Sequence, residues 1–127
     1  MRLALETVFK PIAKQFKPQV LIRNGGADPH HLDELAQLSL SYDGLHDIGD
    51  TVRTTSKDLG CGVVDLLCGG YNPGTEEKGL YSIFSGLIGI EAKFKEESPV
   101  TESERVQRKT ESMLKELIAI LRDYWNL

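Results

Sequence analysis

The hydrophobic positions of the chain alternate between helical spacing and short continuous runs. Residues 3–17 repeat apolar side chains every three or four positions, which predicts a helix. Pro11 removes one backbone donor inside this helix, so we expect a kink or a split there, and Pro18 ends it. The apolar run at 20–22 stops at Asn24-Gly25-Gly26, which predicts a buried parallel strand that opens into a loop.

The same alternation continues through the middle of the chain. Ser41 is a suitable N-cap for a helix over 42–58, and Gly60 is a natural terminator. Residues 62–68 form a second apolar run and predict a second strand. A third helix is expected over about 76–91, and its apolar residues are Leu80, Ile83, Phe84, Leu87 and Ile88.

The C-terminal part predicts one long helix after a charged linker. The linker covers 93–100, and Thr101-x-x-Glu104 has the pattern of a capping box that opens a helix over 101–125. The whole order of elements predicts an α/β fold with a layered parallel sheet, flanking helices and a long C-terminal helix. We expect one domain over 1–127.

The parallel strands bring two loops to one edge of the sheet. The loops at 24–40 and 69–75 follow the carboxyl ends of the two predicted strands, which is where α/β proteins bind ligands. Asp28 and Tyr71 lie in these loops, so we expect them to be neighbours in space although 43 positions separate them.

Composition narrows the class of protein. The chain has 127 residues with a formal charge of −4, 40% hydrophobic and 27% charged residues, which is typical of a globular domain. The acidic balance argues against direct nucleic-acid binding, and no apolar run approaches the ~20 residues of a membrane span. Two cysteines exclude a disulfide framework, and a reduced cytoplasmic location is the expectation.

The first loop is rich in side chains that can bind a metal. Asp28, His30, His31, Asp33 and Glu34 fall within seven positions. Imidazole and carboxylate groups together suit zinc or a similar divalent ion. The alternative is a polar surface loop that carries histidines by chance, and no His-Glu-x-x-His spacing fixes the ligands on a helix.

The second loop offers a rigidly held phenol. Gly69 and Gly70 precede Tyr71, and a phenol at the sheet edge can donate a hydrogen bond to a developing oxyanion. The alternative is a half-buried aromatic side chain with its hydroxyl in water. Cys61 and Cys68 lie at the two ends of the predicted strand, and we expect them in the core.

Together the two loops resemble a known enzyme family. One motif spans the first strand and its loop and runs Phe16-x-Pro18-x-Val20-Leu21-Ile22-x-x-Gly25-Gly26-x-Asp28-x-His30-x-x-Asp33-x-Leu35-x-x-Leu38-x-Leu40-Ser41. The other leads from the second strand into its loop and runs Leu67-x-Gly69-Gly70-Tyr71-Asn72. Both resemble motifs of the zinc-dependent histone deacetylase superfamily, which includes the acetoin-utilisation and acetylpolyamine deacetylases. The resemblance implies part of an arginase/deacetylase-like fold, corresponding to the family's carboxy-terminal third.

The resemblance also implies roles for individual residues. Asp28 is expected to be a zinc ligand, with His30, His31 and Asp33 as weaker metal candidates. Tyr71 is expected to polarise the acetyl-amide carbonyl and to stabilise the tetrahedral intermediate. Gly69 and Gly70 are expected to let the substrate loop pack closely.

Several elements of the family's catalytic set are missing from this sequence. An upstream Asp-x-His zinc pair and a pair of catalytic histidines have no counterpart here, so the resemblance implies a deacetylase-like domain that is incomplete or inactive alone. The alternative is the carboxy-terminal subunit of a split zinc-dependent amidohydrolase, which deacetylates acetyl-lysine or acetylated amines once an amino-terminal chain supplies the other ligands. Zinc is expected only in that case.

Two further expectations concern assembly. Half of a parallel sheet leaves an unpaired edge, which predicts a homo-oligomer, with a dimer as its simplest form. A third option is a new metal site rebuilt across such a dimer from Asp28, His30, His31 and Asp33.

Overall fold

The computed structural model describes residues 1–36, 38–98 and 103–127. The chain divides into two compact units, one formed by Met1–Lys17 with Thr101–Leu127 and the other by Pro18–Val100. The mixture of helices with a small parallel sheet and a long C-terminal helix confirms the predicted α/β class. The expectation of one domain over 1–127 stays a prediction.

The first unit begins with a helix whose hydrogen bonding changes before Pro11. Helix α1 (Arg2–Ala4) continues into a π-helical segment η1 (Leu5–Phe9) and then into α2 (Lys10–Phe16). The backbone N–H of Lys10 donates to Leu5 O, five residues back. The expected kink or split is therefore a π-helical insertion next to the proline, which cannot donate a backbone hydrogen bond.

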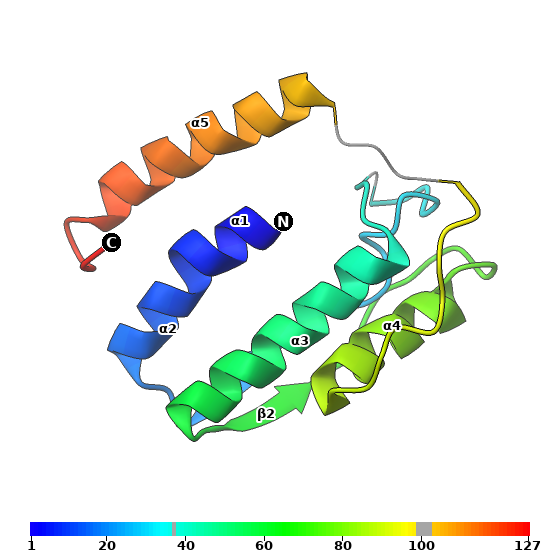
Figure 1. The fold of residues 1–127 in the computed structure, drawn as a ribbon, viewed down its shortest axis with the longest axis horizontal. Coiled ribbons are helices and arrows are strands. Elements are labelled where there is room, and N and C mark those ends of the chain that lie inside the picture. The colour runs from blue at the N-terminus through cyan, green and yellow to red at the C-terminus, as the bar shows by residue number, and fades with distance from the viewer. Residues whose placement is uncertain (37, 99–102) are drawn as a thin grey trace. The chain divides into compact units, whose positions relative to one another are not determined.

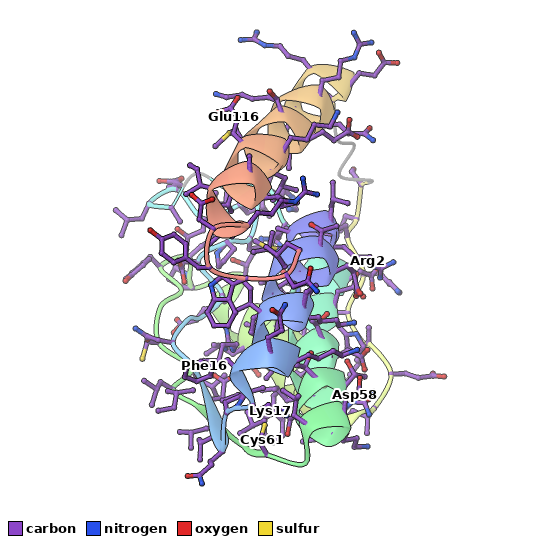
Figure 2. The ribbon with its side chains drawn as sticks, turned by 90° about the vertical axis from the view of Figure 1, so that its left-hand side faces the viewer. Arg2, Phe16, Lys17, Asp58, Cys61 and Glu116 are labelled. Carbon is purple, nitrogen blue, oxygen red and sulfur yellow. The ribbon has the colours of Figure 1, made fainter. Side chains whose placement is uncertain are left out.

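Helix α5 (Glu104–Leu121) and the residues after it complete this unit. The helix begins after Ser103, whose Oγ accepts a hydrogen bond from Val106 N at 3.3 Å, while the predicted cap Thr101 lies outside the described residues. Gln15 exchanges two hydrogen bonds with the backbone of Asn126, at 2.9 and 3.0 Å. Figure 2 shows Phe16 at the end of α2 and Glu116 on α5.

The second unit contains the predicted parallel strand pair. Strand β1 (Val20–Arg23) pairs in parallel with β2 (Gly62–Asp65), with Val20 opposite Gly62 and Arg23 opposite Asp65. Between them lies α3 (Tyr42–Leu59). Its ends are as predicted, because Ser41 Oγ accepts from Gly44 N at 3.1 Å and Gly60 ends the helix in the left-handed conformation.

Strand β2 is shorter than the predicted run over 62–68. The Asp65 carboxylate accepts a hydrogen bond from Leu67 N at 3.0 Å, a local turn that takes the chain out of the sheet, and Leu67 has φ +43°. Cys68 is consequently exposed and Cys61 is only half-buried. The expectation that both cysteines belong to the core was therefore wrong.

Helices α3 and α4 (Glu76–Ile88) pack so closely that their backbones are in contact (Figure 1). A Cβ atom added to Gly49 would lie 2.9 Å from Leu87 N, and one added to Gly86 would lie 2.7 Å from Asp50 N. Leu45 and Ile83 are completely buried at this contact.

The face that α4 buries differs in part from the apolar stripe in its sequence. The apolar residues predicted for that stripe include Phe84 and Ile88, which are 49% and 52% exposed. Apart from Ile83, the residues of α4 that are buried are small, and they include Gly79, Ser82 and Ser85.

In the described ranges, none of the helices combines the length and the hydropathy that a membrane span requires.

Candidate functional site

The loops that follow β1 and β2 meet at the carboxyl edge of the sheet. Ala27 N donates a hydrogen bond to Gly69 O at 3.1 Å. A Cβ atom on Gly26 would overlap the carbonyl oxygens of Cys68 and Gly69, so only glycine allows the two backbones to cross here. The parallel pairing thus brings the two loops together as the sequence predicted.

Asp28 lies directly against the second loop. Its half-buried carboxylate packs on Gly69, where an added Cβ would stand 3.1 Å from Asp28 Cγ and overlap the nearer oxygen. Gly69 has φ +96°, a conformation that favours glycine. Among the residues that the structure describes, no hydrogen bond or ion pair to the half-buried Asp28 carboxylate is found.

Asp33 is buried and both of its oxygens are engaged. Oδ2 accepts from Tyr71 N at 2.7 Å, and Oδ1 accepts from Leu35 N and Ala36 N at 3.0 and 3.2 Å. The Tyr71 N–H is the largest cause that lowers the pKa of the Asp33 carboxyl, followed among the hydrogen bonds by that of Ala36. Asp33 therefore positions the loop that carries Tyr71, which makes its carboxylate less available to a metal than that of Asp28.

Tyr71 has a fixed backbone and an open side chain. It is 61% exposed and lines a surface pocket of about 580 Å³ together with Glu34, Leu35, Asn72 and Pro73. Gly70 precedes it with φ +125°, and a Cβ there would press against Glu76 and Ala27 at 2.9 and 3.2 Å. The glycine pair and Asp33 together hold the tyrosine backbone while its side chain faces the pocket.

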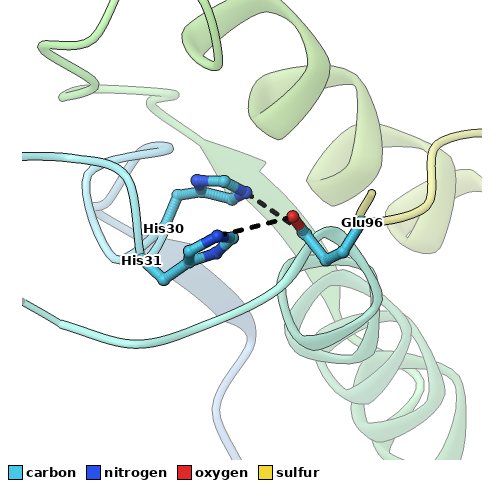
Figure 3. Close-up of side chains that lie close together, drawn as sticks. All are labelled: His30, His31 and Glu96. Atoms are coloured by element: carbon cyan, nitrogen blue, oxygen red, sulfur yellow. Dashed lines mark hydrogen bonds and ion pairs between the residues drawn. The ribbon is translucent and has the colours of Figure 1, made fainter. Parts of the chain in front are cut away.

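His30 and His31 contact a residue that the sequence analysis missed. His30 Nε2 lies 3.1 Å from Glu96 Oε1, and His31 Nε2 lies 3.7 Å from Glu96 Oε2 (Figure 3). Glu96 Oε1 also accepts from Tyr42 N at 2.7 Å, at the first turn of α3. We refer to His30, His31 and Glu96 as the histidine–glutamate cluster.

The protonation of His30 follows from its surroundings. The ring is completely buried, and this burial is the main cause that lowers the pKa of the imidazole below its ordinary value of 6.5, against the opposing effect of Glu96. His30 Nδ1 accepts a hydrogen bond from Leu32 N at 3.3 Å, so the neutral ring carries its proton on Nε2 and donates a hydrogen bond from Nε2 to Glu96.

Comparison with known proteins identifies the family. A profile of the histone deacetylase domain matches residues 1–87, about two thirds of the chain. The chain belongs to the histone deacetylase family. It is 31% identical over 91 residues to histone deacetylase 14, chloroplastic, of Arabidopsis thaliana, a match that covers 70% of this chain and 21% of that protein.

A second deacetylase relative has the same relationship to the chain. Histone deacetylase 10, chloroplastic, of Oryza sativa subsp. japonica is 32% identical over 91 residues, which cover 70% of this chain and 20% of the relative. The chain thus spans about a fifth of the length of both curated relatives.

The donor atoms around Asp28 do not complete a zinc site of the catalytic type. Such sites use three protein ligands and one open position. Within the described part of the chain, the group of three donors that could hold a metal is the histidine–glutamate cluster, and Asp28 is not part of it. The residues present at Asp28 therefore fit zinc only when other ligands join them.

Proposed function

We propose that this chain supplies the carboxyl-terminal part of a zinc-dependent deacetylase site and that another polypeptide segment supplies the rest. The observation that carries the proposal is the position of Asp28, whose carboxylate lies against Gly69 in the loop that presents Tyr71 and has no hydrogen-bond or ion-pair partner among the described residues. One carboxylate and one phenol on a shared edge correspond to the two roles that the family resemblance implies for these residues.

The chain alone lacks what hydrolysis requires. A single carboxylate does not hold zinc usefully, and the sequence has no counterpart of the histidine pair that transfers the proton in the family. We therefore propose that the domain is inactive by itself. The missing ligands and histidine pair come from the preceding part of a deacetylase domain, either joined to this chain or on a separate amino-terminal chain.

Tyr71 has the role of an oxyanion donor in this proposal. Its phenol donates a hydrogen bond to the carbonyl oxygen of an acetylated amine as negative charge develops there, which stabilises the transition state. Asp33 and the glycine pair contribute by fixing the backbone of Tyr71, so the phenol needs little reorganisation. Acetyl-lysine and acetylated small amines are the substrate classes that we propose.

The apolar side chains exposed on the sheet support the proposal that another polypeptide segment covers them. Val20, Ile22, Val64 and Leu66 are 49%, 69%, 46% and 51% exposed, which is unusual for residues in or next to a parallel sheet. Because the chain spans only a fifth of its relatives, we propose that the rest of a deacetylase domain covers these residues. A second copy of the chain is the alternative, and sedimentation of the purified chain at micromolar concentration distinguishes a dimer from a monomer.

Reconstitution tests this function. The chain is mixed with a polypeptide that carries the preceding part of a deacetylase domain of the family, and hydrolysis of an acetyl-lysine peptide is followed with and without zinc. We expect zinc-dependent hydrolysis in the mixture, a loss of about 10²–10³-fold with Tyr71→Phe, and no activity with Asp28→Asn. Tyr124→Phe and Asp58→Asn are matched controls on exposed residues that belong to neither of the two loops, and they should keep full activity.

Two outcomes would contradict the proposal. An inactive mixture whose components bind each other would show that the two parts do not form a deacetylase. A mixture as active with Tyr71→Phe as with the wild-type chain would remove the proposed role of the phenol.

The cytoplasmic location expected from the sequence stays a prediction. The word chloroplastic belongs to the names of the two relatives and describes those proteins.

A further inference from the structure

We propose that the histidine–glutamate cluster binds one divalent transition-metal ion of the zinc type, at a site that does not include Asp28. The proposal rests on the arrangement of His30, His31 and Glu96 and does not depend on the proposed function. Asp28 and Asp33, the carboxylates that the sequence placed beside these histidines, take no part in it.

The distances between the donor atoms suit a small ion. His30 Nε2 and Glu96 Oε1 are 3.1 Å apart, His31 Nε2 and Glu96 Oε2 are 3.7 Å apart, and all three ligand atoms lie within 4.8 Å of one another. Tetrahedral ligands at about 2.0–2.1 Å from zinc are separated by about 3.4 Å. Small movements of the three side chains shown in Figure 3 would therefore be enough for one ion to bind between them.

Two of the three ligands are already oriented by neighbouring groups. His31 Nδ1 lies 3.4 Å from Leu40 O, a carbonyl that can only accept, so Nδ1 carries the proton and the lone pair of Nε2 faces the cluster. Glu96 is held by the Tyr42 N–H at 2.7 Å. Hydrogen bonds of this kind from the outer groups fix metal ligands in position.

His30 binds an ion after a shift of its proton. In the metal-free ring the proton is on Nε2, and ligation requires that it move to Nδ1, which leaves the imidazole neutral and releases no proton overall. The hydrogen bond from Leu32 N to Nδ1 must then open, but it is long at 3.3 Å and Leu32 is 51% exposed, so this turn has room to adjust. The ion replaces the Nε2 proton as the partner of Glu96.

The donor set selects the class of metal. Two imidazole nitrogens and one carboxylate are typical zinc ligands and leave a fourth position for water. Magnesium and calcium prefer sites built from oxygen atoms alone, so we expect them to compete poorly.

Metal titration of the untagged, chelator-stripped chain tests the site. Calorimetry should give one Zn²⁺ per chain, and Co²⁺ should give visible absorption bands of a four-coordinate ion. His31→Ala and Glu96→Gln should each weaken Zn²⁺ binding by at least tenfold. Glu96→Gln keeps an oxygen for the Tyr42 N–H, so it preserves the local fold. His46→Ala and Glu97→Gln are the matched controls and should bind Zn²⁺ like the wild-type chain.

The outcomes separate this site from the deacetylase site. Asp28→Asn should bind Zn²⁺ as tightly as wild type while it abolishes reconstituted hydrolysis. Wild-type affinity in both His31→Ala and Glu96→Gln would overturn the proposal and leave the cluster as a structural ion pair. An equal loss with His46→Ala would also overturn it, because the binding would then be unspecific.

Discussion

The close crossing of the two loops at Gly26 predicts that Gly26→Ala destabilises the fold, and the distances at the crossing indicate by how much. In Gly26→Ala the new Cβ would lie 2.5 Å from Gly69 C and closer still to two carbonyl oxygens, all of them backbone atoms. Carbon atoms in contact are about 3.5–4.0 Å apart, so the loops must separate by about 1 Å. The bond from Ala27 N to Gly69 O, now 3.1 Å, would then exceed hydrogen-bonding distance.

Three contributions set the size of the effect. Overpacking costs about 1–3 kcal/mol and the lost hydrogen bond about 0.5–1.5 kcal/mol. Replacing glycine restricts the unfolded chain and returns about 0.4–1 kcal/mol. The net destabilisation is about 2 kcal/mol, and in a chain of this length the melting temperature should fall by roughly 6–10 °C.

Thermal unfolding followed by circular dichroism measures this difference. Gly62→Ala is the matched control, because the Cβ of this sheet residue would have no atom within 4 Å. Its stability should stay within about 1 kcal/mol of the wild-type value. A Gly26→Ala chain that melts at the same temperature as Gly62→Ala would refute the close crossing on which the position of Asp28 depends.

Two other predictions test the packing around the site. Asp33→Asn should melt below the wild type at neutral pH, because a carboxyl whose folded pKa lies below its ordinary value of 3.8 stabilises the fold while it is ionised. Circular dichroism should show this difference in melting temperature shrinking as the pH falls below 3.8 toward the lower folded-state pKa, and a difference that is constant with pH would contradict this. Gly86→Ala should destabilise the chain by about 1–3 kcal/mol in urea unfolding, since its Cβ would lie 2.7 Å from Asp50 N. The nearest atoms to the Cβ of Gly44→Ala are side-chain atoms of Leu40 and Ser41 at 3.4 Å or more, so this variant should be neutral or stabilising. The opposite order of stabilities would refute the backbone-to-backbone contact of α3 and α4.

The features that the sequence predicted correctly depend on local chemistry. Ser41 and Gly60 bound α3 because capping and the left-handed conformation are decided within a few residues. The parallel pairing of the two strands followed from a helix placed between two short apolar runs, and this pairing brought Asp28 to the tyrosine loop.

The features that were missed depend on distant or competing contacts. Glu96 lies in a charged segment with no periodicity, 66 positions after His30, so nothing local connects the two. The apolar pattern of α4 predicted that Phe84 is buried, but this residue is exposed. The face of α4 that packs on α3 is the one on which Gly49 and Gly86 allow the backbones to come into contact. The predicted strand over 62–68 is longer than β2. The residues after Asp65 are apolar enough to continue the strand, but the hydrogen bond from Leu67 N to the Asp65 carboxylate forms a turn there.

An assay of the purified chain alone, in excess zinc, with an acetyl-lysine peptide as substrate shows whether this polypeptide can act by itself. If Asp28 and Tyr71 form one part of a deacetylase site, that site is incomplete without residues from another segment. We predict no hydrolysis above that of zinc in buffer. Turnover by the unaided chain that disappears with Asp28→Asn would contradict the claim, because it would mean that this polypeptide holds a complete catalytic site.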